Sequence, residues 1–323
     1  MECAKAIVAA VAVVFMLVSL AVIGSYGYVP AADSVRIGYA SNFFGLPLFV
    51  AIDRGYFADE GLKIELTRIE DNPTLVNEVS AGKLDLAVAV GAPTVFSAYG
   101  IANGTFNIIH SNFDTPQVIT SFIIAKTNST ISNLEDLAGK RIGILPANVH
   151  SKVIVSELLK KNSIDPAGVV FVDLPPQLQP QALEAGQVDA LYAFDPVATI
   201  LMDDYNATLV MPVDRTFLQN PYYGGSLLIS GQFTKERPEA ARRVVRALNK
   251  AIDYIAGNEP DARLSLVRYT AISNRTALNL RSKFYFLKPT EINETLLQNE
   301  ADLFFKKGII KQRINTTGMV YRG

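Results

Sequence analysis

Two short motifs occur twice in this chain, and their spacing restricts the folds that are open to it. The tripeptide Arg-Ile-Gly at residues 36–38 returns at residues 141–143, and each copy is followed by an Ala-Gly-x-(Leu/Val)-Asp segment, which ends at Asp85 or Asp189. Arginine and aspartate are 49 residues apart in the first copy and 48 in the second. The offset between the copies is too long for a solenoid repeat. The sequence therefore predicts two similar α/β lobes that face each other.

The first copy has the pattern of a strand, a turn, a helix and a second strand. Val35–Tyr39 and Leu62–Leu66 are apolar runs typical of strands, and a helical pattern begins at residues 45–47 between them. In open α/β sheets ligands bind in the crevice beyond the carboxyl ends of the strands. We therefore expect a ligand cleft lined by four strand-to-helix turns, which are Ser41–Gly45, Gly91–Thr94, Pro146–Ser151 and Tyr192–Asp195.

Three kinds of ligand-binding group occur in and near these turns. Free N–H groups at helix N-termini suit an anion or a polar ring, polar side chains offer hydrogen bonds, and aromatic rings offer apolar walls. The expected ligand-binding residues are Asn42, Phe43, Phe44, Gly45, Gly91, Thr94, Asn148, Ser151, Phe194, Asp195 and Tyr222. Two alternatives are open: each aromatic ring could simply pack its lobe, and Asp195 could cap its own helix instead of binding a ligand amine.

The sequence gives no indication of catalytic or metal-binding residues. His110 and His150 are the only histidines, and we expect both to be surface or hydrogen-bonded polar residues. Histidine, cysteine and carboxylate residues do not occur at metal-ligand spacing, and no nucleophile-elbow or phosphate-loop motif is present. We therefore expect no catalytic residue, no metal and no cofactor. A net charge of −1 gives no reason to expect a nucleic-acid partner.

Residues 1–31 are predicted to be a transmembrane anchor or a signal peptide. Ile7–Ile23 is an apolar run interrupted only by Ser19. Its length is near that of a membrane span and exceeds the usual core of a signal peptide. We favour an uncleaved anchor helix; cleavage near residues 29–31 and a buried core helix are the alternatives.

Six Asn-x-Thr sequons predict N-glycosylation of an exported protein. Their asparagines are Asn103, Asn128, Asn206, Asn274, Asn293 and Asn315. All six sequons have threonine in the third position, although the chain contains 18 threonines and 18 serines. Because that preference is not compositional, we interpret the sequons as glycosylation sites on the extracellular face of the membrane, of an archaeal type.

The other predicted elements define two lobes. Asn72 is expected to cap a helix that runs to Val79, and Ser132 to cap a short helix with Glu135 at the capping-box position. Strands at residues 118–126 and 224–230 are expected to cross between the lobes, and the chain after Pro238 is expected to be mainly helical. The predicted boundaries are 34–120 for lobe 1, with C-terminal helices at about 250–323, and 121–249 for lobe 2.

Several segments, taken in order, resemble the nitrate/sulfonate/taurine family of ABC-transporter solute-binding proteins, which is similar to the pyrimidine-precursor binders of thiamine uptake. They are residues 45–48 and 53–62, 137–143, 185–190 and 194–196. The resemblance implies a two-lobed, type II periplasmic-binding-protein fold that closes on a small solute. It also implies delivery of that solute to a membrane permease driven by a cytoplasmic ATPase. The family often has Trp-Glu-Pro where this chain has Phe194-Asp195-Pro196, and a Gly-Ser pair is missing from residues 146–151.

We therefore expect an importer component that binds a small anionic or zwitterionic solute, such as a sulfonate, taurine or nitrate. A pyrimidine precursor is an alternative solute. The same fold is similar to enzymes, namely the thiamine-pyrimidine synthases, which use a histidine and iron, and the chorismate-processing dehydratases. Those enzymes work in the cytosol, so the apolar N-terminal segment and the six sequons favour transport.

Overall fold

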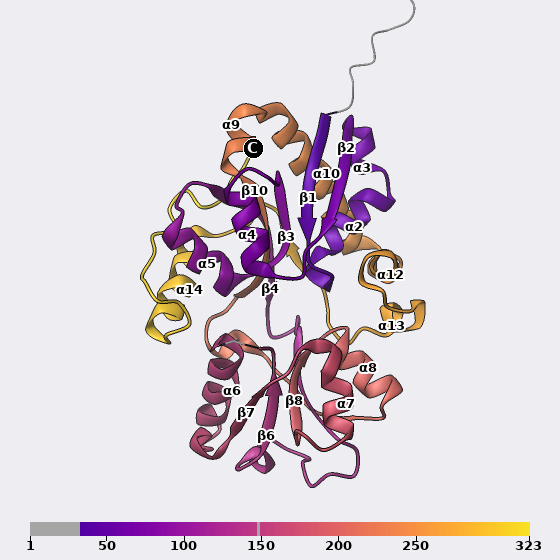
Figure 1. Ribbon diagram of the computed structural model, residues 1–323, viewed down its shortest axis with the longest axis vertical. Coiled ribbons are helices and arrows are strands. Elements are labelled where there is room, and N and C mark those ends of the chain that lie inside the picture. The colour runs from indigo at the N-terminus through magenta and orange to yellow at the C-terminus, as the bar shows by residue number, and fades with distance from the viewer. Residues whose placement is uncertain (1–32, 147–148) are drawn as a thin grey trace, which may run out of the picture. The chain divides into compact units, whose positions relative to one another are not determined.

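The computed structural model describes residues 33–146 and 149–323, and residues 34–323 form one compact unit (Figure 1). The predicted anchor or signal peptide at residues 1–31 lies outside the described residues. Within the described ranges, no helix combines the length and the apolar character that crossing a membrane requires.

The first lobe is built on a six-stranded sheet in the order β11-β4-β10-β3-β1-β2. Its strands are β1 (Asp33–Tyr39), β2 (Leu62–Arg68), β3 (Leu86–Gly91), β4 (Phe106–Asp114), β10 (Tyr222–Ser230) and β11 (Phe286–Leu287). β1 and β3 are parallel, whereas β10 lies antiparallel between β3 and β4. β10 is therefore a strand inserted from much later in the chain.

The second lobe repeats this arrangement in a five-stranded sheet, in the order β7-β6-β8-β5-β9. Its strands are β5 (Ser121–Ala125), β6 (Arg141–Ile144), β7 (Val170–Asp173), β8 (Ala190–Phe194) and β9 (Thr208–Pro212). β6 and β8 are parallel, and β5 lies antiparallel between β8 and β9. Each sheet thus receives one antiparallel strand from the other part of the chain, which confirms the two α/β lobes and the two crossing strands.

Helices cover the faces of both sheets (Figure 1). The first lobe carries α2 (Leu46–Asp53), α3 (Tyr56–Asp59), α4 (Asn72–Ser80) and α5 (Ala92–Ile101), and the second carries α6 (Val149–Lys161), α7 (Gln179–Glu184) and α8 (Val197–Asp204). After β10 come α9 (Gly231–Glu236), α10 (Pro238–Gly257), α11 (Glu259–Arg263), α12 (Ser265–Thr270), α13 (Asn274–Asn279) and α14 (Glu294–Lys306). Helix α10 buries an apolar stripe that includes Val244, Leu248 and Ile255, at helical spacing.

The repeated arginine and aspartate form the same clamp in both lobes. The backbone N–H of Arg36 donates to Asp85 Oδ2 at 2.8 Å, its Nη2 donates to Asp85 Oδ1 at 2.7 Å, and Nη2 also reaches the carbonyl of Gly82 at 2.8 Å. Arg141 makes the equivalent bonds, at 2.8 Å each, to Asp189 and to the carbonyl of Gly186. The clamp joins β1 to the start of β3 in the first lobe, and β6 to the start of β8 in the second. The sequence repeat therefore has a structural role, at the end of each sheet that lies away from the other lobe.

The glycine of each Arg-Ile-Gly tripeptide leaves room for leucine side chains. A Cβ atom on Gly38 would lie 2.5 Å from Leu84, and one on Gly143 would lie 2.5 Å from Leu191. Both distances are far below van der Waals contact. Each residue of the tripeptide therefore has a structural role: the arginine forms the clamp, the isoleucine is buried, and the glycine lets a leucine side chain pack directly on the strand backbone.

Some local predictions are wrong. The N-cap of α4 is Asp71, which accepts from the backbone N–H of Thr74, and not Asn72. Ser132 does not cap a helix; Asp136 instead accepts hydrogen bonds from its backbone N–H and its hydroxyl. Strands β4 and β9 were not predicted. The boundary at residue 249 is too late, because β10 already pairs in the first sheet.

We expect Asp85→Ala to destabilise the fold more than Asp189→Ala. The Asp85 side chain is 3% exposed, so its loss would leave the backbone N–H of Arg36 without an acceptor in a buried place, at a cost of about 1–3 kcal/mol. The Asp189 side chain is 30% exposed, so water can replace its bonds more easily. Urea unfolding of the two variants measures the difference, and equal losses would contradict the argument.

Candidate functional site

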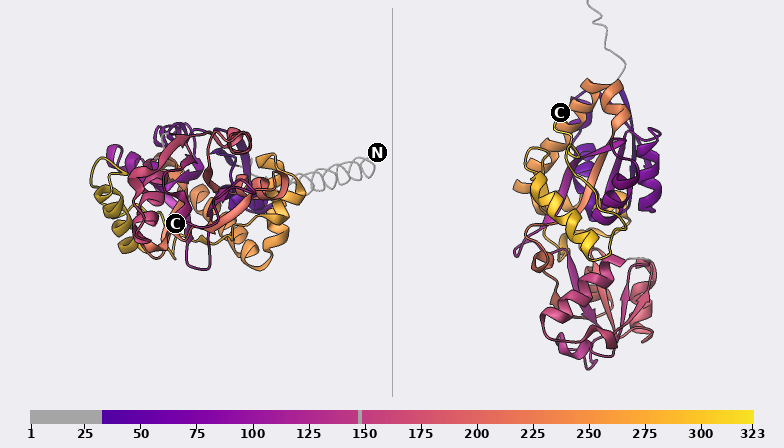
Figure 2. Two further views of the ribbon diagram at one scale, coloured as in Figure 1. Left: turned by 90° about the horizontal axis from the view of Figure 1, so that it is seen from below. Right: turned by 90° about the vertical axis from the view of Figure 1, so that its left-hand side faces the viewer.

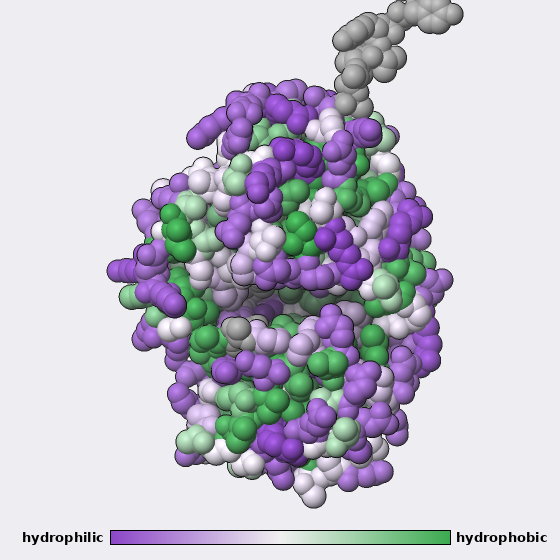
Figure 3. Space-filling view, viewed as in Figure 1, coloured by the Kyte–Doolittle hydropathy of each residue, from purple (hydrophilic) through white to green (hydrophobic). Residues whose placement is uncertain are grey.

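The polarity of the strands brings all four predicted turns to the facing ends of the two sheets. Gly91 at the end of β3 pairs with Gly225 of β10, and Phe194 at the end of β8 pairs with Ser121 of β5. The crossing segments therefore leave and enter the sheets at the same ends as the turns. Figure 3 shows a hollow across the middle of the molecule in this region. This cleft is the candidate site.

The first turn presents an aromatic ring and uses its polar side chain to hold its own shape. Asn42 caps a short 3-10 turn, accepting from the N–H of Phe44 at 3.0 Å. Phe43 is buried and packs on Phe44, with ring centroids 4.2 Å apart. The half-buried Phe44 lies over β10, because a Cβ atom on Gly225 would be 2.8 Å from its ring.

The second turn leaves a hydroxyl available. Gly91 is the N-cap of α5, and its N–H donates to Asn72 Oδ1 at 3.1 Å. Thr94, in the first turn of α5, is half-buried, and its hydroxyl makes no hydrogen bond within the described residues. Gly45, which precedes α2, packs closely on the ring of Phe49. Thr94 is thus a polar side chain at the end of β3 whose hydroxyl has no hydrogen-bond partner among the described residues.

In the second lobe most of the predicted polar groups are occupied. Asp195 is 3% exposed; its Oδ1 accepts from the N–H and hydroxyl of Thr199, and its Oδ2 accepts from the N–H of Ser282 at 2.6 Å. The capping alternative for Asp195 is thus the one the geometry shows. Ser151 is buried in α6, and Asn148 lies outside the described residues.

His150 is buried, not on the surface. Its Nε2 forms a hydrogen bond with the hydroxyl of Tyr222, the first residue of β10, and the two rings are nearly parallel. His110 is also buried, in β4, with its Nε2 2.9 Å from Asn249 Oδ1. Both histidines therefore serve the interior of the fold, and His150 joins the second lobe to a strand of the first.

A buried ion pair that the sequence did not reveal lies where the chain crosses between the lobes. Arg215 Nε donates to Asp114 Oδ2 at 2.7 Å, and Arg215 Nη2 donates to the hydroxyl of Thr120 at 2.7 Å. The guanidinium carbon lies 4.9 Å from the ring centroid of Tyr222 and 5.9 Å from that of Phe194. A guanidinium has five N–H groups, and within the described residues only two of those of Arg215 have an acceptor.

Burial shifts the pKa of the other titratable groups of this region toward the uncharged form. It lowers the pKa of His150 to about 3, with a smaller effect of the nearby charge of Arg215. Burial raises the pKa of the Glu300 carboxyl well above its usual value; its Oε2 accepts from the N–H of Tyr223 at 2.8 Å. Burial likewise raises the pKa of Tyr192 to about 12. Arg215 therefore supplies the positive charge between the lobes, and Asp114 balances it.

The C-terminal arm (residues 274–323) contacts the second lobe at two places, α8 and α6. Arg281 pairs with Asp203 of α8 at 2.7 Å, and Lys307 after α14 pairs with Glu157 of α6 at 2.5 Å. In the right-hand view of Figure 2, α14 (yellow) faces the viewer and runs along the first lobe toward the second. These ion pairs hold the two lobes together around the cleft.

Two further expectations concern the sequon asparagines and metal binding. All six sequon asparagines are exposed. In residues 33–146 and 149–323, no group of three or more histidine, cysteine or carboxylate side chains could hold a metal ion.

Comparison with known proteins identifies the family. The family described as NMT1/THI5 like matches residues 42–262. A Bacillus subtilis (strain 168) protein named "Putative aliphatic sulfonates-binding protein" is 25% identical over 252 residues, which are 77% of this chain and 73% of that protein. The Saccharomyces cerevisiae 4-amino-5-hydroxymethyl-2-methylpyrimidine phosphate synthase THI13 is 24% identical over 224 residues, which are 66% of this chain and 63% of that protein.

Solved structures show the same fold. The periplasmic aliphatic sulphonate binding protein SsuA from Escherichia coli superposes with a TM-score of 0.72 at 16% identity, over 90% of this chain and 97% of that chain. The predicted two-lobed periplasmic-binding-protein fold is confirmed.

Acid is expected to destabilise the fold through its two buried histidines. Burial lowers the pKa of His150 to about 3 and that of His110 to about 4, whereas an unfolded histidine titrates at about 6.5. The unfolded chain therefore binds more protons between these values. Stability from the neutral rings is complete above about pH 6.5 and is lost as the pH falls, by up to about 1.4 kcal/mol per pH unit for each histidine.

Urea unfolding at about pH 7, 6 and 5 measures this slope, since most carboxylates titrate below that range. His110→Gln should lower the slope by the contribution of one histidine, up to about 1.4 kcal/mol per pH unit, whatever its effect on stability at pH 7. An unchanged slope in both His110→Gln and His150→Gln would show that other groups cause the acid sensitivity.

Proposed function

Because the chain belongs to the NMT1/THI5-like family, we propose that it is the solute-binding component of an ABC importer. It captures a small solute in the cleft between its lobes and delivers it to a permease driven by a cytoplasmic ATPase. It works on the extracellular face of the membrane, to which its N-terminal segment anchors it or through which that segment exports it. The similarity to a sulfonate-binding relative and the two-lobed fold support this role.

The observation that carries the proposal is the placement of Arg215. A buried arginine with unused N–H groups lies between two aromatic rings, where four strand-to-helix turns face each other. Burying an arginine is costly, and replacing a buried ion pair by apolar residues of similar volume is often neutral or stabilising. Packing alone therefore gives no reason for an arginine at this position. The unused N–H groups offer a hydrogen-bonding site for the acceptor oxygens of a solute.

The charge balance of the cleft favours a small solute that is either zwitterionic or carries a single anionic group. Asp114 already neutralises Arg215, and His150 is uncharged, so the positive charge that a ligand meets is modest. The N-termini of α5, α6 and α8 add partial positive charge through their free N–H groups. A sulfonate, taurine or nitrate spreads its charge over several oxygens and suits such a site.

Within this proposal, the predicted residues divide into two sets. Thr94, the aromatic rings of Phe44 and Phe194 and the backbone at Gly91 meet the solute together with Arg215, whereas Ser151 stays in the interior of α6. Asn42, Phe43, Gly45, Asp195 and Tyr222 hold the shape of the cleft through the contacts described above. Asn148, which lies outside the described residues, stays a predicted ligand-binding residue.

An enzymatic role is the second candidate, because several relatives are named 4-amino-5-hydroxymethyl-2-methylpyrimidine phosphate synthases. Formation of that pyrimidine phosphate by the purified protein would move the conclusion to the enzyme. Specific binding of a precursor without turnover would keep the transport role and change the solute.

A thermal-shift screen against alkanesulfonates, taurine, nitrate, bicarbonate and pyrimidine precursors tests the proposal directly. A solute present at about 100 times its Kd stabilises the folded protein by ~2.7 kcal/mol, which raises Tm measurably. We expect a sulfonate or another small anionic or zwitterionic solute to give this shift. Failure of every solute in the panel, together with pyrimidine phosphate formation, would overturn the binding-protein role.

Thr94→Ala is expected to weaken binding of the solute that the screen identifies. Its hydroxyl has no protein partner to lose, so the variant should fold normally, while a lost buried hydrogen bond to the solute costs on the order of 1–3 kcal/mol, roughly tenfold in Kd. Isothermal titration calorimetry measures the change. Thr67→Ala, on the exposed surface of β2, is the matched control. Equal affinity in both variants would place the solute elsewhere.

A further inference from the structure

None of the six sequons is part of the four turns that form the cleft. Asn103 precedes β4 and Asn128 follows β5, and both positions are at the sheet ends opposite the cleft. Asn206 lies beside the Asn128 loop, since Thr127 donates a hydrogen bond to its carbonyl. The three other sequons belong to the C-terminal arm. Modification at Asn103, Asn128 or Asn206 is therefore remote from the cleft.

The sequon side chains are also distinct in their hydrogen bonding. Across the described ranges, none of the six sequon amide nitrogens donates a hydrogen bond, whereas five of the twelve other asparagines do, namely Asn42, Asn107, Asn162, Asn258 and Asn279. In Asn293 and Asn315 the amide oxygen is used instead, accepting from the N–H of the sequon threonine at 2.9 and 3.0 Å. A sugar attached at Nδ2 would preserve both bonds.

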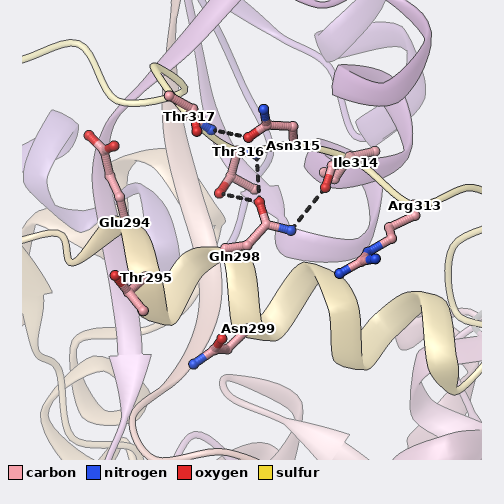
Figure 4. Close-up of a pocket in the computed structure, with 9 residues that line it drawn as sticks. All are labelled: Glu294, Thr295, Gln298, Asn299, Arg313, Ile314, Asn315, Thr316 and Thr317. Carbon is pink, nitrogen blue, oxygen red and sulfur yellow. Dashed lines mark hydrogen bonds between the residues drawn. The ribbon is translucent and has the colours of Figure 1, made fainter.

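Two of these sequons meet at one depression on the surface. Nine residues of α14 and of the segment 313–317 enclose a volume of about 690 Å³, and they include Asn315 and the sequon threonines Thr295 and Thr317 (Figure 4). No residue of the cleft turns lines it. The depression is therefore separate from the solute site.

The depression is preformed and polar. Gln298 fixes its floor, donating to the carbonyl of Ile314 at 2.9 Å and accepting from the N–H of Thr316 at 2.8 Å. Its lining is polar apart from Ile314, whereas pockets for small apolar ligands are mostly apolar. The hydroxyls of Thr295 and Thr317 have no hydrogen-bond partner among the described residues. Hydroxyl and amide groups of this kind suit the hydroxyls of a sugar.

We propose that the depression between α14 and residues 313–317 seats a glycan N-linked to Asn315. The first sugars fold back from Asn315 onto α14 and cover the threonine hydroxyls and the exposed Asn299. The glycan thereby fixes the segment 313–317 against the helix. A free saccharide has the same chemistry, but only an attached glycan is held at the rim by its own covalent bond.

Glycopeptide mass spectrometry and hydrogen exchange on the full protein from its native host test this proposal. Thr317→Ala removes the sequon while keeping the backbone N–H that bonds Asn315, and Thr317→Ser keeps the sequon. We expect the alanine variant to lose the Asn315 glycan and to exchange amides of residues 294–299 and 313–317 at least about threefold faster. We expect the serine variant, and Asn103→Gln at a remote sequon, to leave this exchange unchanged.

Two results would overturn the proposal. One is a native protein with bare Asn315, including the case in which a free saccharide binds the depression of that bare protein. The other is a glycosylated Asn315 whose removal does not change exchange in either segment, because a glycan that projects into water would protect nothing. Either result leaves the solute-binding proposal untouched, since the cleft and the depression share no residue.

Discussion

The parallel pairing of β1 with β3 and of β6 with β8 fixes where a ligand can bind. Two Arg–Asp clamps hold this pairing, Arg36 with Asp85 and Arg141 with Asp189, at the ends of the sheets that face away from the cleft. With the starts of the strands fixed in register, their carboxyl ends and the helices that follow must open toward the other lobe. The chemistry of the cleft thus depends on ion pairs that a ligand never meets.

The buried pair of Arg215 and Asp114 has a different role. It lies where both connections pass between the lobes, so its hydrogen bond to Thr120 joins one crossing to the other. Removing one partner of a buried ion pair leaves an uncompensated charge and is strongly destabilising. The pair therefore holds the two connections in one arrangement, and the rings of Tyr222 and Phe194 pack beside its guanidinium. In the proposed function, the same arginine serves both the structure and the recognition of the solute.

The sequence predicted what short segments encode and missed what distant contacts create. The repeat predicted the two lobes and most of the parallel strands, because the spacing between Arg36 and Asp85 reflects how β1 pairs with β3. β4 was missed because polar residues, including a buried His110, interrupt its apolar pattern. The buried ion pair of Arg215 could not be predicted, because its partner Asp114 is 101 positions away in the sequence. His150 was expected to be a surface or hydrogen-bonded polar residue, and it is hydrogen-bonded; its partner Tyr222 could not be predicted because the contact depends on how the two lobes come together.

Residue type alone overestimates the number of polar groups that can bind a solute. Asn42 and Asp195 belong to residue types that recognise ligands well, yet each uses its side-chain oxygens to hold a turn or a helix. Such groups set the position of the backbone N–H groups around them, so they affect recognition through geometry. In the proposed function, side-chain specificity rests on the few donors without a protein partner among the described residues, chiefly Thr94 and the remaining N–H groups of Arg215. A site with so few fixed donors is well suited to solutes that share one oxygen-rich group and differ in the rest of the molecule.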